Sequence, residues 1–113
     1  MINVFLDDLR PCPEGFVWIK DAGYLIYQFE CYNDLELRVN ILSLDHDLGE
    51  DKPTGYDFCK WLVEIGIDNP EIYPKVIYLH TANGVGRDNM FKLLERYKPD
   101  WVELHRSPMP NND

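Results

Sequence analysis

The sequence predicts an α/β fold built on a parallel sheet that helices cover on both faces. Short runs of apolar and β-branched residues alternate along the chain with longer segments whose apolar residues recur at helical spacing. This alternation is typical of parallel sheets. Several of the short runs also stop abruptly at acidic or polar residues, and open parallel sheets bind ligands just beyond the carboxyl ends of their strands. A functional site is therefore expected at that edge of the sheet.

Five short runs are predicted strands, and they cover residues 2–6, 16–19, 41–45, 75–79 and 101–104. The first is followed directly by Asp7 and Asp8, and the third ends at Asp45. His80 and His105 come directly after the fourth and the fifth. Because the carboxyl ends of parallel strands meet at one edge of a sheet, these side chains are expected along that edge.

Three segments have apolar residues at helical spacing, and they cover residues 22–33, 54–66 and 84–97. The second opens with Thr54 and Asp57, whose spacing resembles a capping box. Between the first two predicted strands, by contrast, Pro11 and Pro13 exclude a regular helix. The tryptophans stand in strand or helical contexts and are expected in the core: Trp18, Trp61 and Trp101.

At 113 residues the chain is long enough for one domain with a real core. We expect the domain to cover residues 1–106, followed by a tail of residues 107–113. The formal charge of −9, from 20 acidic and 11 basic residues, repels polyanions and argues against generic nucleic-acid binding. It still allows a small phosphorylated ligand, or an RNA end held by a metal and one or two local cations. The sequence points to no protein partner.

Nothing in the composition points to a membrane or to secretion. The apolar runs fall far short of a membrane span. The beginning of the chain also lacks the charged segment and long apolar stretch of a signal peptide. The cysteines, Cys12, Cys31 and Cys59, are odd in number and have neither metal-binding nor disulfide spacing. A cytoplasmic protein with reduced thiols is therefore expected.

Four carboxylates, those of Asp7, Asp8, Asp45 and Asp47, are expected together at the sheet edge. Two unit charges ~4 Å apart repel by ~4 kcal/mol at an effective dielectric constant of about 20, so all four can be ionised only beside a counter-charge. Mg²⁺ or Mn²⁺ suits them, because hard divalent cations take oxygen ligands and keep waters for a phosphate. Alternatively, Asp7 and Asp47 are turn residues or helix caps, the common use of aspartate after a strand.

The other polar residues near this edge each have a functional and a structural interpretation. His80 is a general acid or base, a phosphate ligand, or a structural partner. Thr81 and Asn83, which precede two glycines at a helix start, form either a cradle for an oxyanion or an ordinary N-cap. Arg10 pairs with a phosphate or with Asp8. His46 is a metal ligand or, as its position between two aspartates favours, a solvent-facing spacer.

These residues, in this order, resemble a response-regulator receiver domain. In receivers an acidic pair follows the first strand, as Asp7 and Asp8 do here. A phosphoacceptor Asp ends the third strand, where Asp45 stands, and a small hydroxyl residue ends the fourth, where Thr81 stands. The resemblance implies a flavodoxin-like, three-layer sandwich with a five-stranded, mostly parallel sheet in the order 2-1-3-4-5. The segment between Asp8 and the second strand departs from receivers, because it is too short and too rich in proline for the usual first helix, which we expect to be reduced or lost. The Lys that receivers carry after the fifth strand is missing from residues 105–108, which argues against phosphorelay signalling.

The chain resembles more closely the receiver-like family named for cyclic-phosphate processing. Its pattern matches residues 5–13, 43–49, 55–57, 61–62 and 80–83. The likeness extends from residue 2 to about residue 94. It implies a metal-dependent phosphoester hydrolase, with Mg²⁺ or Mn²⁺ as cofactor, that processes the cyclic phosphates of nucleotides or RNA ends.

Eight residues have roles on this interpretation: Asp7, Asp8 and Asp45 as metal ligands, Asp47 and His80 as catalytic residues, and Arg10, Thr81 and Asn83 as phosphate ligands. Asp47 would bind the metal or activate the attacking water, and His80 would protonate the leaving oxygen. The alternative function is that of a receiver-like binding or signalling module without enzymatic activity, phosphorylated on Asp45.

Overall fold

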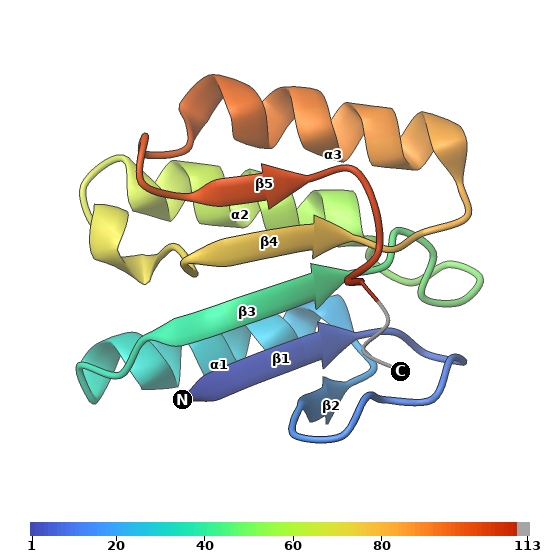
Figure 1. Cartoon of the computed structure of the whole chain (residues 1–113), viewed down its shortest axis with the longest axis horizontal. Helices are drawn as coiled ribbons and strands as arrows, with labels where there is room; N and C mark the ends of the chain where they lie inside the picture. Colours follow the sequence, from blue (N-terminus) through green and yellow to red (C-terminus); the bar gives the residue numbers. More distant parts are fainter. Residues whose placement is uncertain (111–113) are drawn as a thin grey trace.

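The chain alternates strands and helices in the order that its sequence pattern predicts. The computed structural model describes residues 1–110. These form β1 (Ile2–Leu6), β2 (Val17–Ile19), α1 (Ala22–Asp34), β3 (Val39–Leu44), α2 (Gly55–Gly66), the short 3₁₀-helix η1 (Pro70–Ile72), β4 (Val76–Leu79), α3 (Gly84–Tyr97) and β5 (Glu103–His105) (Figure 1). All pairings in the sheet are parallel, and its order is β2-β1-β3-β4-β5. The predicted fold class and strand order are therefore confirmed.

The three α-helices lie on one face of the sheet. Each of them connects a strand to the next strand in the same direction across the sheet, and right-handed crossovers put such connections on the same face. Figure 1 shows α1 and α2 behind the strands. The main core fills the space between the sheet and these helices, and its members include Leu6, Leu44, Leu79, Phe29, Phe58 and Met90.

The opposite face of the sheet lacks the helical layer that the sequence led us to expect. Residues 7–16 connect β1 to β2 as a loop, in which Pro11 and Pro13 exclude a helix, and no helix follows β5 as far as Pro110. The loss of the first helix is therefore confirmed. This loop and the beginning of the predicted tail cover the face instead. Residues 111–113 of that tail lie outside the described residues.

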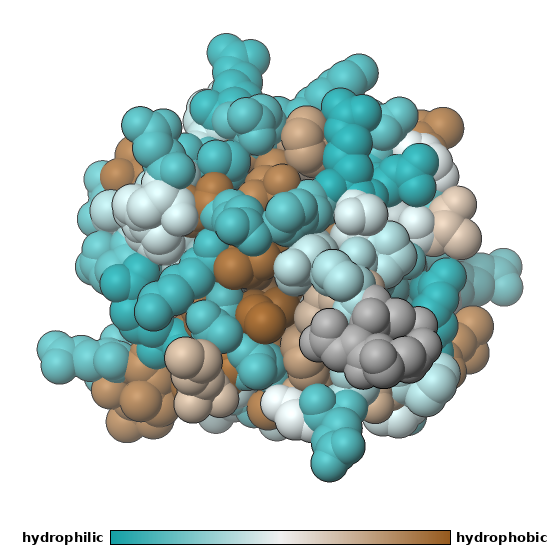
Figure 2. Space-filling model, in the orientation of Figure 1, coloured by the Kyte–Doolittle hydropathy of each residue, from teal (hydrophilic) through white to brown (hydrophobic). Residues whose placement is uncertain are grey.

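Figure 2 views the molecule from this second face, with hydrophobic side chains visible in a hollow that hydrophilic ones surround.

The element bounds differ little from the prediction. β5 begins at Glu103, later than expected, because the amide of Val102 closes a turn on the carbonyl of Pro99 at 3.1 Å. The capping box of α2 is present: the Thr54 hydroxyl accepts from the amide of Asp57 at 3.3 Å, and the Thr54 amide donates to the Asp57 carboxylate at 2.8 Å. A local signal in the sequence therefore defined the start of this helix correctly.

Two of the three tryptophans are surface residues, so their expected place in the core is wrong. Trp18 is 40% exposed and Trp101 is 48% exposed, whereas Trp61 is partly buried against the core. Trp18 lies in the edge strand β2, and the ammonium of Lys20 lies 4.4 Å from the centre of its ring. The guanidinium of Arg38 covers Trp101 in the same way at 4.9 Å. Each of these two exposed rings therefore packs against a cationic side chain instead of against the core.

All three cysteines are unpaired in the structure. Within residues 1–110, no helix has both the length and the apolar character needed to span a membrane.

Two glycines allow the first turns of α2 and α3 to lie against the segment that follows β3. A Cβ atom on Gly55 would collide with the backbone carbonyl of Asp45, and one on Gly86 would collide with the ring of His46. The amide of Gly55 also donates to the carbonyl of His46 at 2.8 Å. These contacts hold the segment that carries Asp45 and Asp47 at the carboxyl edge of the sheet.

Candidate functional site at the carboxyl edge of the sheet

A pocket of about 630 Å³, here called the rim pocket, lies at the carboxyl ends of β1, β3 and β4. It exists because Leu6 pairs with Leu44 and Leu44 pairs with Leu79, which puts the next residues of the three strands in one row. Seven of the eight predicted site residues line the pocket: Asp7, Asp8, Arg10, Asp45, Asp47, Thr81 and Asn83. The eighth, His80, is buried beside it.

Asp7 is the centre of the site, and its side chain has no exposed surface. Its Oδ1 accepts from the amides of Leu9 at 2.8 Å and Arg10 at 3.0 Å. Its Oδ2 accepts from Arg10 Nη1 at 3.0 Å and pairs with His80 Nε2 at 2.9 Å. Burial alone would raise the pKa of Asp7, but these four donors outweigh it, so that the pKa lies below its ordinary value. Asp7 is therefore a buried, ionised carboxylate.

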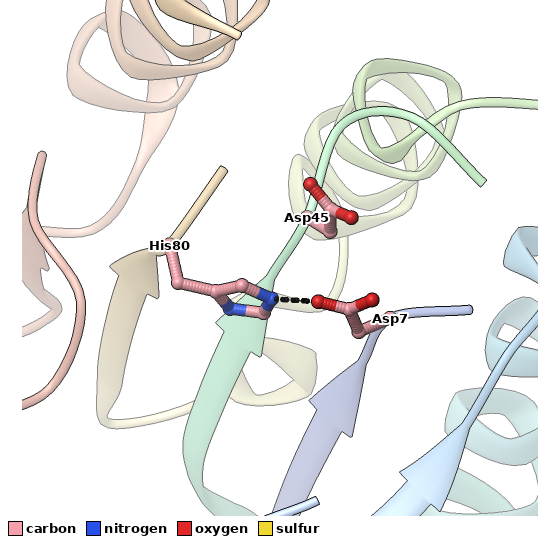
Figure 3. A group of neighbouring side chains, drawn as sticks. All are labelled: Asp7, Asp45 and His80. Carbon is pink, nitrogen blue, oxygen red and sulfur yellow. Dashed lines mark hydrogen bonds and ion pairs between the residues drawn. The ribbon is translucent and has the colours of Figure 1, made fainter. Parts of the chain in front are cut away.

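The ring of His80 extends from the end of β4 toward the carboxylate of Asp7 (Figure 3). Its ring stacks on Phe5 with centroids 4.5 Å apart, and its Nδ1 lies 2.6 Å from Ser43 Oγ. Burial lowers the pKa of His80 by more than the neighbouring carboxylates, led by Asp7, raise it, so the ring is neutral at pH 7. An ionised carboxylate only accepts, so Nε2 carries the proton and Nδ1 accepts from the Ser43 hydroxyl.

Arg10 supplies the positive charge between the two buried carboxylates. Its Nη1 donates to Asp7 Oδ2 at 3.0 Å and to Asp45 Oδ2 at 3.3 Å. The hydrogen bond to Asp7, the largest contribution, raises the pKa of Arg10. The sequence predicted a metal as counter-charge for four carboxylates, and Arg10 meets part of that need at two of them. Its partners are Asp7 and Asp45, so the expected pairing with Asp8 is wrong. Asp7, Asp45 and His80 nevertheless each offer a ligand atom, and these atoms lie within 4.8 Å of one another, so the cluster can hold a metal ion.

The carboxylates of the rim pocket differ in how many hydrogen bonds their oxygens already accept, and so in how many lone pairs remain for another ligand. Both oxygens of Asp7 already accept two hydrogen bonds each. Each oxygen of Asp45 accepts one, from the amide of His46 and from Arg10. The carboxylate of Asp8 accepts none from residues 1–110. The carboxylates of Asp8 and Asp45 therefore keep free acceptor positions that the carboxylate of Asp7 lacks, and hard divalent cations take such oxygen ligands.

Asp47 lies at the mouth of the rim pocket, where its side chain is 67% exposed. His46 Nδ1 lies 3.0 Å from its Oδ1, and Asn83 Nδ2 donates to its Oδ2 at 3.2 Å. The hydrogen bond from His46, more than that from Asn83, holds the pKa of Asp47 below its ordinary value. His46 itself is only 17% exposed and packs against Gly86, so the solvent-facing spacer that the sequence favoured is wrong.

Asn83 forms the ordinary N-cap that the sequence left open as an alternative. Its Oδ1 accepts from the amide of Gly86 at 2.9 Å, at the first turn of α3. Thr81 is 4% exposed, and its Oγ1 accepts from the amide of Asn83 at 3.1 Å. The hydroxyl hydrogen of Thr81 has no acceptor among the residues that the structure describes. Thr81 can therefore donate into the rim pocket, whereas Asn83 is committed to its cap and to Asp47.

Sequence reasoning missed two residues that hold the site together. Ser43 binds the ring of His80, and the indole nitrogen of Trp18 donates to the carbonyl of Asp7 at 2.7 Å. A polar residue two positions before Asp45, in the otherwise apolar run of residues 41–44, was a signal for Ser43, since alternate strand residues share a face. No comparable signal pointed to Trp18. His105 lies elsewhere, stacked on Tyr78 at 4.7 Å.

The fold and this site together define a class of protein: a receiver-like α/β domain with an acidic pocket at the carboxyl edge of its sheet. The family model of the cyclic-phosphate processing receiver domain matches residues 2–96. Because this match covers most of the chain, the protein belongs to that family. Comparison with curated proteins and with solved structures found no match.

Proposed function

We propose that the protein hydrolyses a phosphoester bond of a cyclic phosphate, carried by a nucleotide or an RNA end, with the help of Mg²⁺ or Mn²⁺. The observation that carries this proposal is the convergence of five carboxylates, the fifth being that of Glu50, and one guanidinium in the rim pocket. Carboxylates suit a divalent metal and a guanidinium suits a phosphate, so the pocket has ligands for both. The family's description, which names cyclic-phosphate processing, supports the choice of substrate.

Arg10 and Thr81 are the proposed phosphate ligands. The side chain of Arg10 is 45% exposed, and only its Nη1 is used by Asp7 and Asp45. A guanidinium has five N–H groups, so most of them remain for phosphate oxygens. The Thr81 hydroxyl adds a neutral donor from the opposite side of the same pocket. The role of Asn83 is to hold the carboxylate of Asp47 in position.

Asp8 and Asp45 are the proposed metal ligands, because their oxygens have free acceptor sites. A bound divalent ion would polarise the phosphoryl group and lower the pKa of a water molecule. Asp7, which the sequence also suggested as a ligand, is proposed instead to hold Arg10 and His80. This assignment leaves the buried hydrogen bonds of Asp7 intact.

The reaction needs one proton removed and one supplied. A water oxygen bonds to phosphorus, and the bond from phosphorus to one ring oxygen breaks. Asp47, ionised and exposed at the pocket mouth, is proposed to accept the proton of that water. The leaving oxygen takes a proton from solvent at the same mouth. Both ring nitrogens of His80 are engaged, so its proposed role is to orient Asp7 and, through Asp7, Arg10.

The alternative function, a signalling module phosphorylated on Asp45, has one observation in its favour. Asp45 stands where receivers carry the phosphoacceptor and lines the rim pocket. Its side chain, however, is only 8% exposed, and one of its oxygens pairs with Arg10. A phosphoryl donor would have to displace that guanidinium, which makes this the weaker of the two proposals.

Hydrolysis of a nucleoside 2′,3′-cyclic monophosphate with millimolar Mg²⁺ or Mn²⁺, followed by ³¹P NMR, tests the enzymatic proposal. We expect metal-dependent ring opening that falls at least about 100-fold in Asp45→Asn, as for the loss of one main electrostatic group. Asp68→Asn, a change at an exposed residue away from the pocket, should leave the rate unchanged. Absence of turnover, together with acetyl-phosphate labelling that Asp45→Asn abolishes, would replace the enzyme with the signalling module.

A further inference from the structure

A second pocket, here called the face groove, lies on the sheet face that no described helix covers, and its volume is about 720 Å³. We propose that the face groove binds the base of a nucleoside whose phosphate occupies the rim pocket. This inference rests on the proposed function and makes it more specific, because it assigns a separate binding site to the base of the nucleotide. Apart from Arg10, Ser43 and His80, the residues that line the face groove have no role in the proposed chemistry.

The two pockets are adjacent, and their walls share one residue. Arg10 lines both of them. Asp7 lines the rim pocket, His80 lines the face groove, and these two side chains are joined by a hydrogen bond of 2.9 Å. Because the Arg10 side chain is 45% exposed, a ligand can extend over it from one pocket into the other. A molecule that binds phosphate on one side of Arg10 would therefore carry its next group into the face groove.

The lining of the face groove suits a flat, largely apolar group. Phe16, Ile41 and Met109 contribute aromatic, branched and thioether surface, next to the prolines of the connecting loop and the tail. Ligand pockets of small molecules typically measure roughly 300–1,000 Å³ and combine such surface with a few polar groups. The polar groups here include the carboxylate of Glu14, which can accept from the amino and imino groups of a base.

The face groove exists because a loop, and not a helix, lies on this face of the sheet. The missing helix between β1 and β2 would have covered this face, and a loop with Pro11 and Pro13 takes its place. The hydrophobic hollow in Figure 2 is on this face. A second copy of the chain is a poor occupant, since each copy carries a formal charge of −9 and the copies repel one another. A base itself carries no charge at neutral pH, and the phosphate attached to it would lie beside the guanidinium of Arg10.

An NMR titration of the full chain in Mg²⁺ distinguishes these ideas, using inorganic phosphate, ribose 5-phosphate, adenosine and adenosine 3′-monophosphate as probes. We expect the nucleotide to bind about 10-fold more tightly than ribose 5-phosphate, the gain typical of one stacked base. Binding of the nucleotide should shift the NMR signals of Phe16, Ile41 and Met109. Inorganic phosphate should shift the signals of Arg10 and of other residues of the rim pocket, with much smaller changes at Phe16 and Met109. Phe16→Ala should remove the advantage of the nucleotide and leave phosphate binding unchanged. Tyr27→Ala, at a residue of α1 that is 59% exposed, is the matched control.

The outcomes separate the two proposals. Equal affinity for the nucleotide and ribose 5-phosphate would refute the base site and leave the phosphate site standing. Binding of adenosine at the face groove without any binding of phosphate would support the base site and refute the phosphate site. Shifts at Phe16 and Met109 on raising the concentration of free protein would show that a second copy occupies the groove, and would overturn the proposal.

Discussion

His80 donates a hydrogen bond of 2.9 Å to Asp7, a carboxylate without any exposed surface. The donor is a neutral ring and the acceptor is an ion, because burial lowers the pKa of His80 while hydrogen bonds outweigh burial at Asp7. Such a carboxylate is stable only when its oxygens are fully satisfied. Stability and function of the site therefore depend on the same few contacts.

Acidification from about pH 7.5 to about pH 5.5 should destabilise the protein through His80. Its folded-state pKa lies below the ordinary value of 6.5, chiefly because the ring is buried. The unfolded chain therefore binds the proton first, so the stability from the neutral ring is present above the unfolded pKa and lost as the pH falls through the folded pKa. Urea unfolding at both pH values measures this loss. His80→Gln should reduce the pH dependence and His105→Gln should keep it; the same dependence in wild type and His80→Gln would contradict the prediction.

Ser43→Ala should lower the free energy of unfolding by about 1–3 kcal/mol, because His80 Nδ1 loses its buried donor. In the wild-type protein, ¹⁵N NMR of the imidazole should show the proton on Nε2 and an acceptor at Nδ1. Ser43→Thr keeps the hydroxyl and should retain this tautomer, at some cost in packing. A proton on Nδ1 in the wild type would mean that the hydrogen bond between Ser43 and His80 runs in the opposite direction.

In Arg10→Met, a bound Mg²⁺ ion should take over the role of the lost guanidinium beside Asp45. Without the guanidinium, Asp7 and Asp45 each lose a donor, and the free energy of unfolding without metal should fall by about 1–3 kcal/mol. Stabilisation by millimolar Mg²⁺, followed as the shift in Tm, should increase, because the metal no longer competes with Arg10 for Asp45. Phosphate binding should be lost. Arg38→Met, which removes a guanidinium over Trp101, is the control, and an unchanged Mg²⁺ effect in Arg10→Met would count against metal binding at Asp45.

Gly55→Ala should destabilise the protein by about 1–3 kcal/mol, the usual cost of overpacking, because the new methyl group meets the backbone carbonyl of Asp45. A backbone atom cannot rotate away as a side chain can. Gly84→Ala provides the comparison, since the nearest atom to its Cβ is the end of the Arg87 side chain at 3.7 Å. Thermal unfolding of both variants measures the difference. Equal stability of the two would show that α2 can move away from the site.

Local patterns in the sequence predicted those parts of the fold that depend on neighbouring residues. The alternation of strands and helices and the Thr54 cap were correct because each is encoded within a few positions. The strand order came from resemblance, and the row of Asp7, Asp45 and His80 followed from parallel register. These features were predictable because regular elements repeat.

Side-chain partners within loops and between distant strands were not predictable. Arg10 reaches Asp7 through an irregular turn, and no periodic rule describes such a contact. Ser43 and His80 are 37 positions apart, and their contact depends on how the ring tilts over the sheet. The metal expected from four nearby carboxylates was an argument about charge alone, and Arg10 met part of that need from inside the chain.

The loop that replaces the missing helix belongs to two pockets at once, since Arg10 lines both and Phe16 lines the face groove. A shift of Arg10 toward a phosphate must therefore alter the wall against which a base would lie. Thermodynamic linkage makes such an effect reciprocal: by whatever factor one ligand group changes the affinity for the other, the second changes the affinity for the first. The factor by which free phosphate changes the affinity for a nucleoside should therefore equal the factor by which the nucleoside changes the affinity for phosphate. The irregular loop between β1 and β2 would transmit this coupling.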